Sequence, residues 1–115
     1  MQKQRVGLMA NNYKNSKVDL TTTNITTLYT APSATQTVVK SILVSNDSGS
    51  DDTVTLTITD SASAIFSVYK NEEVGALSSK ELLSQPLIVM ESEILKVTAA
   101  TANRLHVVAS YLEIT

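Results

Sequence analysis

Residues 53–59 constrain the fold more than any other part of the sequence, because polar and apolar side chains alternate through them without a break. Successive side chains of a β-strand point to opposite faces, so Val54, Leu56 and Ile58 are predicted to face a core. The threonines between them then face water or a partner. Threonine branches at Cβ, which disfavours a helix and suits a pleated surface. This segment therefore predicts a half-buried strand.

Further short strands, separated by polar turns, are predicted along the rest of the chain. They cover residues 25–30, 37–45, 64–70, 86–90, 94–99 and 104–114. Residues 46–52 have the composition of a hairpin loop. Residues 71–73 are predicted to form a polar break, and residues 74–80 fit either a strand or a loop. Seven or eight strands with turns about every 8–12 residues favour an all-β fold, a single-domain antiparallel β-sandwich or a jelly-roll-like barrel.

A chain of 115 residues fits one domain. We assign residues 19–115 to the β-sandwich domain. Residues 1–18 carry four basic side chains and no acid, and are predicted to form a flexible basic arm. An arm that reaches onto an acidic neighbour is the alternative. Its basic residues are Lys3, Arg5, Lys14 and Lys17.

The composition excludes several kinds of chemistry and partner. Cysteine is absent, which rules out disulfides, thiolate metal ligands and thiol catalysis. A net charge of −2 gives no general attraction to nucleic acid. The longest apolar run, residues 87–90, is far too short to cross a bilayer. We therefore expect synthesis in a host cytoplasm and partners that are neither nucleic acid nor membrane.

Two predicted strands are apolar on both faces, which one small sandwich has difficulty covering. In residues 104–114 and in residues 37–45, apolar side chains occupy odd and even positions alike. A loop or the basic arm could cover the second face, and so could a neighbouring subunit. We favour a partner protein, because so short a chain has few spare segments. The predicted interface residues are Val39, Leu43, Val108, Leu112 and Ile114.

No arrangement typical of an enzyme is found. His106 is the only histidine and lies within a predicted strand. A Ser–His–Asp site needs a nucleophile and an orienting carboxylate beside the histidine. The sequence has no Gly-x-Ser-x-Gly motif and no glycine-rich phosphate loop. We predict no catalytic activity and no cofactor.

A calcium site in the predicted hairpin loop is a weak alternative. Asp47, Asp51 and Asp52 could supply three carboxylates, and calcium binds six to eight oxygen atoms. The spacing does not match that of an EF-hand loop, and Asp-rich turns are common for conformational reasons. We therefore predict no metal, and keep these residues as the one candidate.

Residues 28–32 (LYTAP), 38–46 (VVKSILVSN) and 53–58 (TVTLTI) together resemble small structural proteins of tailed bacteriophages. In those proteins a YTAP or YTVP segment precedes a strand that ends in Asn, a polar loop and a Thr/Val strand. The resemblance extends through residues 86–100 and 110–114. Residues 33–35 and 91–93 depart from it, because glycine-containing turns are usual at both places.

The resemblance implies a non-enzymatic virion component that is present in many copies, contacts other virion proteins and is a homo-oligomer. Within that class we expect an accessory protein of the neck, tail or fibre attachment. A capsid decoration protein is the first alternative. The second is a carbohydrate-binding domain of a fibre or adhesin, which would use exposed tyrosines.

Overall fold

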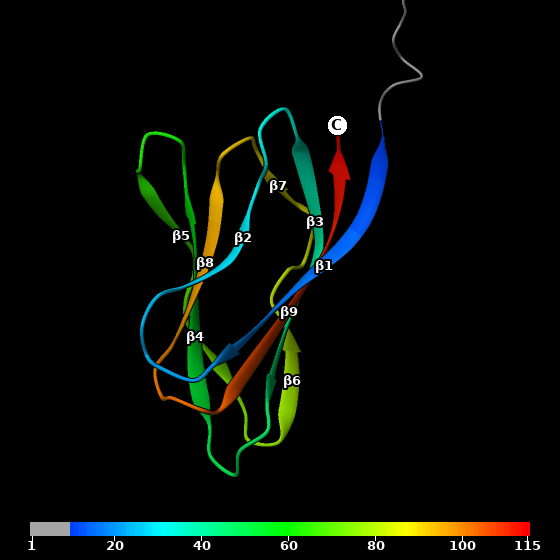
Figure 1. The fold of residues 1–115 in the computed structure, drawn as a ribbon. Helices are drawn as coiled ribbons and strands as arrows, with labels where there is room; N and C mark the ends of the chain where they lie inside the picture. Colours follow the sequence, from blue (N-terminus) through cyan, green and yellow to red (C-terminus); the bar gives the residue numbers. More distant parts are fainter. Residues whose placement is uncertain (1–9) are drawn as a thin grey trace, which may run out of the picture.

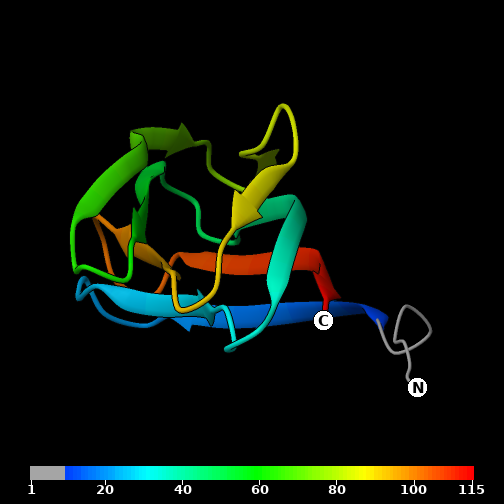
Figure 2. The same cartoon turned by 90° about the horizontal axis from the view of Figure 1, so that it is seen from above.

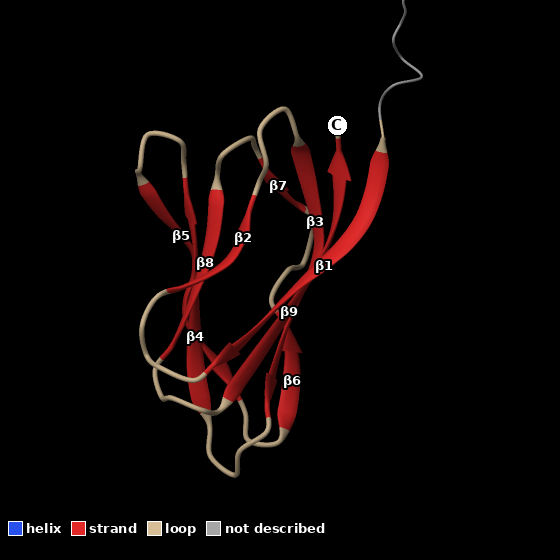
Figure 3. Ribbon diagram, in the orientation of Figure 1, coloured by secondary structure: helices blue, strands red, loops and turns tan. Residues whose placement is uncertain are grey.

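A computed structural model describes residues 10–115, and these residues form nine β-strands in two antiparallel sheets (Figures 1 and 3). The five-stranded sheet contains β1 (Asn11–Leu20), β9 (Leu105–Ile114), β3 (Gln36–Asn46), β6 (Ser78–Glu81) and β7 (Leu87–Val89). The four-stranded sheet contains β2 (Thr26–Thr30), β8 (Ile94–Ala99), β4 (Asp52–Thr59) and β5 (Ile65–Val74). The predicted all-β sandwich is confirmed, with nine strands in place of seven or eight.

An aliphatic core fills the space between the two sheets. Val54 and Leu56 of β4 are fully buried, as the alternation of residues 53–59 predicts. From the other sheet, Leu105 and Val107 of β9 pack into the same cluster. Each fully buried aliphatic side chain contributes about 1.5–3 kcal/mol, so this cluster is the main stabilising element of the fold.

The first strand was not predicted. Residues 11–18, assigned from the sequence to a flexible arm, form most of β1, so that assignment is wrong for them. β1 pairs with β9 over ten residues without a bulge, from Asn11 opposite Ile114 to Leu20 opposite Leu105. Residues 1–9 of the predicted arm, including Lys3 and Arg5, lie outside the described residues. β1 lies beside β2 at one side of the sandwich (Figure 2).

A β-bulge in β3 changes which side chains reach the core. The register of β3 against β9 shifts between Val39 and Ser41, and the Glu81 carboxylate accepts a hydrogen bond from the N–H of Ile42 (2.8 Å). One extra residue reverses the alternation beyond it. Val39 is therefore fully buried, and its predicted place on the outward face is wrong. Val38 points outward instead.

β5 continues through the predicted polar break at residues 71–73. Lys70 and Asn71 lie together opposite Thr55, and Asn71 has a positive φ of 54°. Asparagine tolerates this left-handed conformation better than most residues. The N–H of Asn71 donates to Oγ1 of Thr55 (3.1 Å). The polar residues thus form a bulge within the strand rather than an end to it.

Candidate protein–protein interface

The outward surface of the five-stranded sheet carries seven apolar side chains that the chain leaves exposed or half-buried, here called the apolar face. They come from four strands (β1, β3, β7 and β9), and they are Tyr13, Val38, Leu43, Ile88, Val108, Leu112 and Ile114. Four of the five predicted interface residues belong to it. The fifth, Val39, is replaced by its neighbour Val38.

One row of the apolar face crosses four adjacent strands. Leu112 of β9 lies between Tyr13 of β1 and Val38 of β3, and Val38 lies opposite Ile88 of β7. Directly opposed residues of antiparallel strands point to the same face with their Cβ atoms about 4.5–5.5 Å apart. The ring of Tyr13 is 76% exposed and the side chain of Ile88 is 50% exposed. The row is therefore a continuous apolar strip that is open at both ends.

A second, shorter row runs parallel to the first. Val108 of β9 lies opposite Leu43 of β3, which is 39% exposed, and opposite Lys17 of β1. Between the two rows lies a polar row in which Ser110 opposes Asn15 and Ser41. The apolar face thus consists of two apolar rows separated by short hydroxyl and amide side chains.

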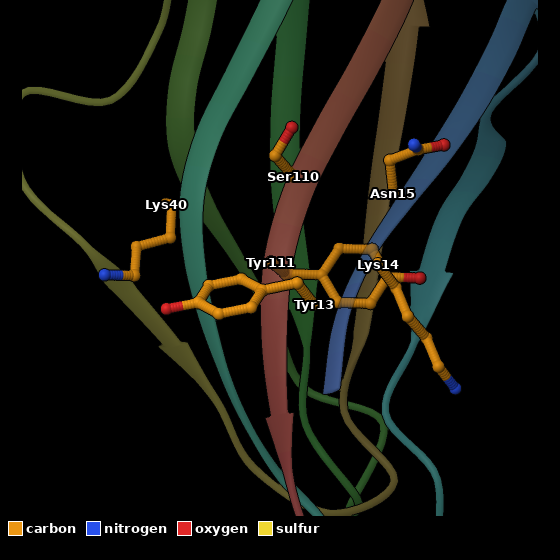
Figure 4. Close-up of a pocket in the computed structure, with 6 residues that line it drawn as sticks. All are labelled: Tyr13, Lys14, Asn15, Lys40, Ser110 and Tyr111. Atoms are coloured by element: carbon orange, nitrogen blue, oxygen red, sulfur yellow. The ribbon is translucent and has the colours of Figure 1, made fainter. Parts of the chain in front are cut away.

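A shallow depression of about 440 Å³ lies next to Tyr13. Its lining residues are Tyr13, Lys14, Asn15, Lys40, Ser110 and Tyr111. In Figure 4 the ring of Tyr13 extends from β1 across β9 toward Lys40 of β3. Lys40 occupies the bulge of β3, so the bulge shapes the far wall of this depression.

A buried polar network lies beneath this part of the sheet. Glu113 of β9 is buried, accepts a hydrogen bond from the Tyr29 hydroxyl (2.5 Å) and forms an ion pair with Nζ of Lys14 (2.8 Å). The Lys14 ammonium, followed by the Tyr29 hydroxyl, lowers the pKa of the Glu113 carboxyl. Glu113 in turn raises the pKa of Lys14, and burial raises the pKa of Tyr29. Lys14, predicted as an arm residue, therefore fastens β1 to the sandwich.

The loop that was the calcium candidate uses its side chains to hold its own conformation. Asp51 accepts a hydrogen bond from the N–H of Ala76 (2.9 Å), and the Asp52 carboxylate accepts from the N–H groups of Thr53 (2.8 Å) and Thr101 (3.3 Å). Asp47 is exposed. Within residues 10–115 no three His, Cys, Asp or Glu side chains come together as metal ligands. The structure does not gather the candidate residues into a site.

His106 lies on the outward surface at one end of the apolar face. Its Nε2 is 3.3 Å from Oδ1 of Asp19, and its Nδ1 is 3.8 Å from Oδ2 of Asp47. A catalytic histidine needs one nitrogen directed at the nucleophile. Both nitrogens of His106 face carboxylates, while the nearby hydroxyl of Ser45 is bonded to Ser79 (2.9 Å). This geometry is that of a surface ion pair.

Sequence reasoning missed three members of the apolar face: Tyr13, Val38 and Ile88. Tyr13 lies in a polar segment that gives no strand signal, and the bulge at Lys40 exchanged Val38 for Val39. The apolar run of residues 87–90 did signal a strand. The position of Ile88 on its outward side follows only from the pairing with β3.

The described residues contain no helix long and apolar enough to cross a membrane. No protein-family model and no curated protein matches the chain.

Solved structures similar to this chain include the following two. One is a pentameric capsid protein isolated from metagenomic phage sequences, with 21% identity and a TM-score of 0.48 over 87% of this chain. The other is the structure of infectious bursal disease virus, Gt strain, with 11% identity and a TM-score of 0.47 over 91% of this chain. The chain spans 59% of the first protein and 30% of the second.

Proposed function

We propose that this chain is a non-enzymatic structural component of a virus particle and acts through protein–protein contacts of its apolar face. Within that role we assign it to the neck, tail or fibre attachment of a tailed bacteriophage, where it contacts other virion proteins and further copies of itself. The proposal rests on the resemblance of the sequence to small phage structural proteins and on the apolar face. A capsid decoration protein would use the same face.

The apolar face is the observation that carries the proposal. Burying one exposed aliphatic side chain fully contributes about 1.5–3 kcal/mol. Association costs about 4–15 kcal/mol of lost translational and rotational freedom, so one or two such residues cannot hold a complex. Four of the seven apolar side chains are already half-buried and contribute only part of this value, so a stable contact requires a partner that covers both rows together.

The outward surface of the other sheet differs in character. Its central strand β4 presents Thr53, Thr55 and Thr57, and Lys96 and Thr98 of β8 lie opposite them. Hydroxyl and ammonium groups of this kind remain hydrated at little cost. Ile65 of the edge strand β5, opposite Thr59, is 65% exposed, so this surface carries fewer apolar side chains than the apolar face rather than none. The difference supports a contact through the five-stranded sheet.

Incorporation into particles tests the proposal. The chain is expected in purified virions, and electron cryomicroscopy of the intact particle would locate it in the neck, tail, fibre base or capsid surface. Leu112→Lys places a charge in the centre of the longer apolar row and is expected to prevent incorporation while the circular dichroism spectrum stays native. Thr98→Lys on the other sheet is the matched control. Normal incorporation of Leu112→Lys would refute the proposal.

The carbohydrate-binding alternative depends on exposed tyrosine rings. Tyr29 and Tyr111 are buried and Tyr69 is half-buried, which leaves Tyr13 as the most exposed ring of the described residues. A glycan-array signal that is lost in Tyr13→Ala and kept in Leu112→Lys would favour this alternative over a virion contact.

A further inference from the structure

Among the described residues, the sandwich has one long sheet edge that is neither short, bulged nor interrupted by proline. Natural edge strands are protected by shortness, bulges, prolines or unpaired charges. β6 and β7 have four and three residues, β2 has five residues and a bulge, and β5 contains two register shifts. β1 has ten residues, no proline and an unbroken register against β9.

The two lysines of β1 differ as guards of the edge. A guarding lysine works by presenting an unpaired charge to an approaching strand. Lys14 is held in an ion pair with the buried Glu113 and presents no such charge. Nζ of Lys17 donates to the neutral amide oxygen of Asn15 on the same strand (3.0 Å), so Lys17 keeps its charge, and any strand that pairs with this edge must offer it a suitable partner.

The free side of β1 presents a regular set of hydrogen-bonding groups. The N–H of Thr115 donates to the carbonyl of Ala10 (3.0 Å), which makes these two residues a hydrogen-bonded pair of the ladder. Hydrogen-bonded and non-hydrogen-bonded pairs alternate between antiparallel strands. The even-numbered residues of β1 therefore bond to β9, and the odd-numbered residues direct N–H and C=O to the other side of the strand, where the carbonyl of Asp19 already accepts a hydrogen bond from the N–H of Thr21 (2.9 Å). The odd-numbered residues are Asn11, Tyr13, Asn15, Lys17 and Asp19.

We propose that a second copy of this chain occupies this edge, with β1 pairing antiparallel to its own copy about a two-fold axis at Asn15. In a two-fold symmetric contact, the residue numbers of every opposed pair add up to the same value. When the axis lies at Asn15, each of the five outward-directed residues of one copy lies opposite an outward-directed residue of the other copy. This register joins the two five-stranded sheets into one continuous sheet.

Side-chain complementarity supports this register. It places Tyr13 of one copy opposite Lys17 of the other, and Asn11 opposite Asp19, so that no like charges oppose each other. An ammonium group beside an aromatic ring and an amide beside a carboxylate are favourable pairs. Registers centred on Lys14 or Lys17 would place two lysines directly opposite each other.

The same register joins the apolar rows of the two copies. The row that ends in Tyr13 continues through Lys17 of the second copy into Val108 and Leu43 of that copy. A dimer therefore presents a longer apolar surface to a third protein than one chain does. The role of this dimer in a larger assembly rests on the proposed function. The dimer itself is tested with the purified chain alone, so the dimer and the proposed function can be refuted independently.

Sedimentation of the purified full-length chain tests the dimer. Twice the mass of one chain is expected at high concentration, with dissociation on dilution. Asn15→Pro removes an N–H that points away from β9 and blocks the edge, so it is expected to abolish the dimer and keep a native circular dichroism spectrum. Leu112→Lys, which alters the apolar face and leaves the edge intact, is expected to remain dimeric.

A cysteine in this cysteine-free chain tests the register directly. Asn15→Cys brings two thiols together at the axis, with a Cα–Cα separation of about 5.5 Å in a paired ladder, which a disulfide can span. Oxidation is expected to give a covalent dimer, whereas Ser84→Cys in an exposed loop gives none. A native chain that stays monomeric would overturn the inference. So would a dimer that persists in Asn15→Pro and does not cross-link through Asn15→Cys.

Discussion

The hydroxyl of Tyr29 donates a hydrogen bond of 2.5 Å to Oε2 of Glu113, and this bond joins the two sheets of the sandwich. Tyr29 belongs to β2 and Glu113 to β9. Because the tyrosine proton goes to the carboxylate, the hydroxyl of Thr37 donates in turn to the Tyr29 oxygen (2.8 Å). Lys14 completes the network from β1. A buried carboxylate is thus held by groups from three other strands.

Removal of the Tyr29 hydroxyl should destabilise the fold. Tyr29→Phe keeps the ring, which lies 4.2 Å from that of Tyr111 between centroids, and deletes one donor to the buried carboxylate of Glu113. A hydrogen bond to a charged group contributes about 1.5–3 kcal/mol, and Glu113 keeps its ion pair with Lys14. Urea unfolding should show a decrease of this size. Tyr13→Phe, which deletes an exposed hydroxyl, is the control, and equal effects of the two changes would show that the network contributes nothing.

Acid should weaken the fold through the same carboxylate. Lys14 and Tyr29 hold the pKa of Glu113 below its ordinary value of 4.5. A group with a lowered folded-state pKa contributes stability that is fully present above its unfolded value and is lost as the pH falls through the folded value. The free energy of unfolding should therefore decrease as the pH falls below about 4.5. Glu113→Gln should remove this part of the decrease. If the free energy of unfolding of that variant falls with pH as steeply as that of the native chain, Glu113 is not the group responsible.

The core strands could be predicted because their side chains alternate. In β4 the apolar residues Val54, Leu56 and Ile58 alternate with threonines, so burial on one side fixes both the strand and its orientation. The β1 segment from Asn11 to Lys17 has no such pattern. It is a strand because β9 offers it a complete ladder of backbone partners and because Lys14 reaches the buried Glu113. Neither cause can be read from the segment alone.

The composition of the apolar face could be predicted only in part for a related reason. Leu112 and Val108 follow from the alternation of β9. The exchange of Val39 for Val38 depends on the bulge at Lys40, which the carboxylate of Glu81 holds from 39 residues away in the sequence. A single register shift reverses the faces of a strand. Long-range contacts of this kind decide the orientation of a side chain after local propensity has made the strand.

Calcium should leave the stability of the chain unchanged. The carboxylates of Asp51 and Asp52 accept hydrogen bonds from the N–H groups of Ala76, Thr53 and Thr101, and a cation would have to displace these bonds. A ligand that binds the folded state raises the melting temperature in proportion to the logarithm of its concentration at saturation. Thermal melts with calcium chloride and with a chelator should coincide. A rise that disappears in Asp51→Asn would restore the calcium site.

The bulge in β5 should depend on the residue at position 71. Asn71 has a φ of 54°, and the left-handed region costs most residues about 1–2 kcal/mol. A β-branched side chain is strained further there, so Asn71→Val should lower the free energy of unfolding by at least that amount in a urea titration. Asn71→Gly distinguishes the contribution of the backbone conformation from that of the side chain. Glycine adopts this conformation without strain, so this variant should have a free energy of unfolding within about 0.5 kcal/mol of the native value. Equal losses in the two variants would mean that the side-chain contact from Oγ1 of Thr55 to Oδ1 of Asn71 (3.5 Å), rather than the backbone conformation, maintains the bulge.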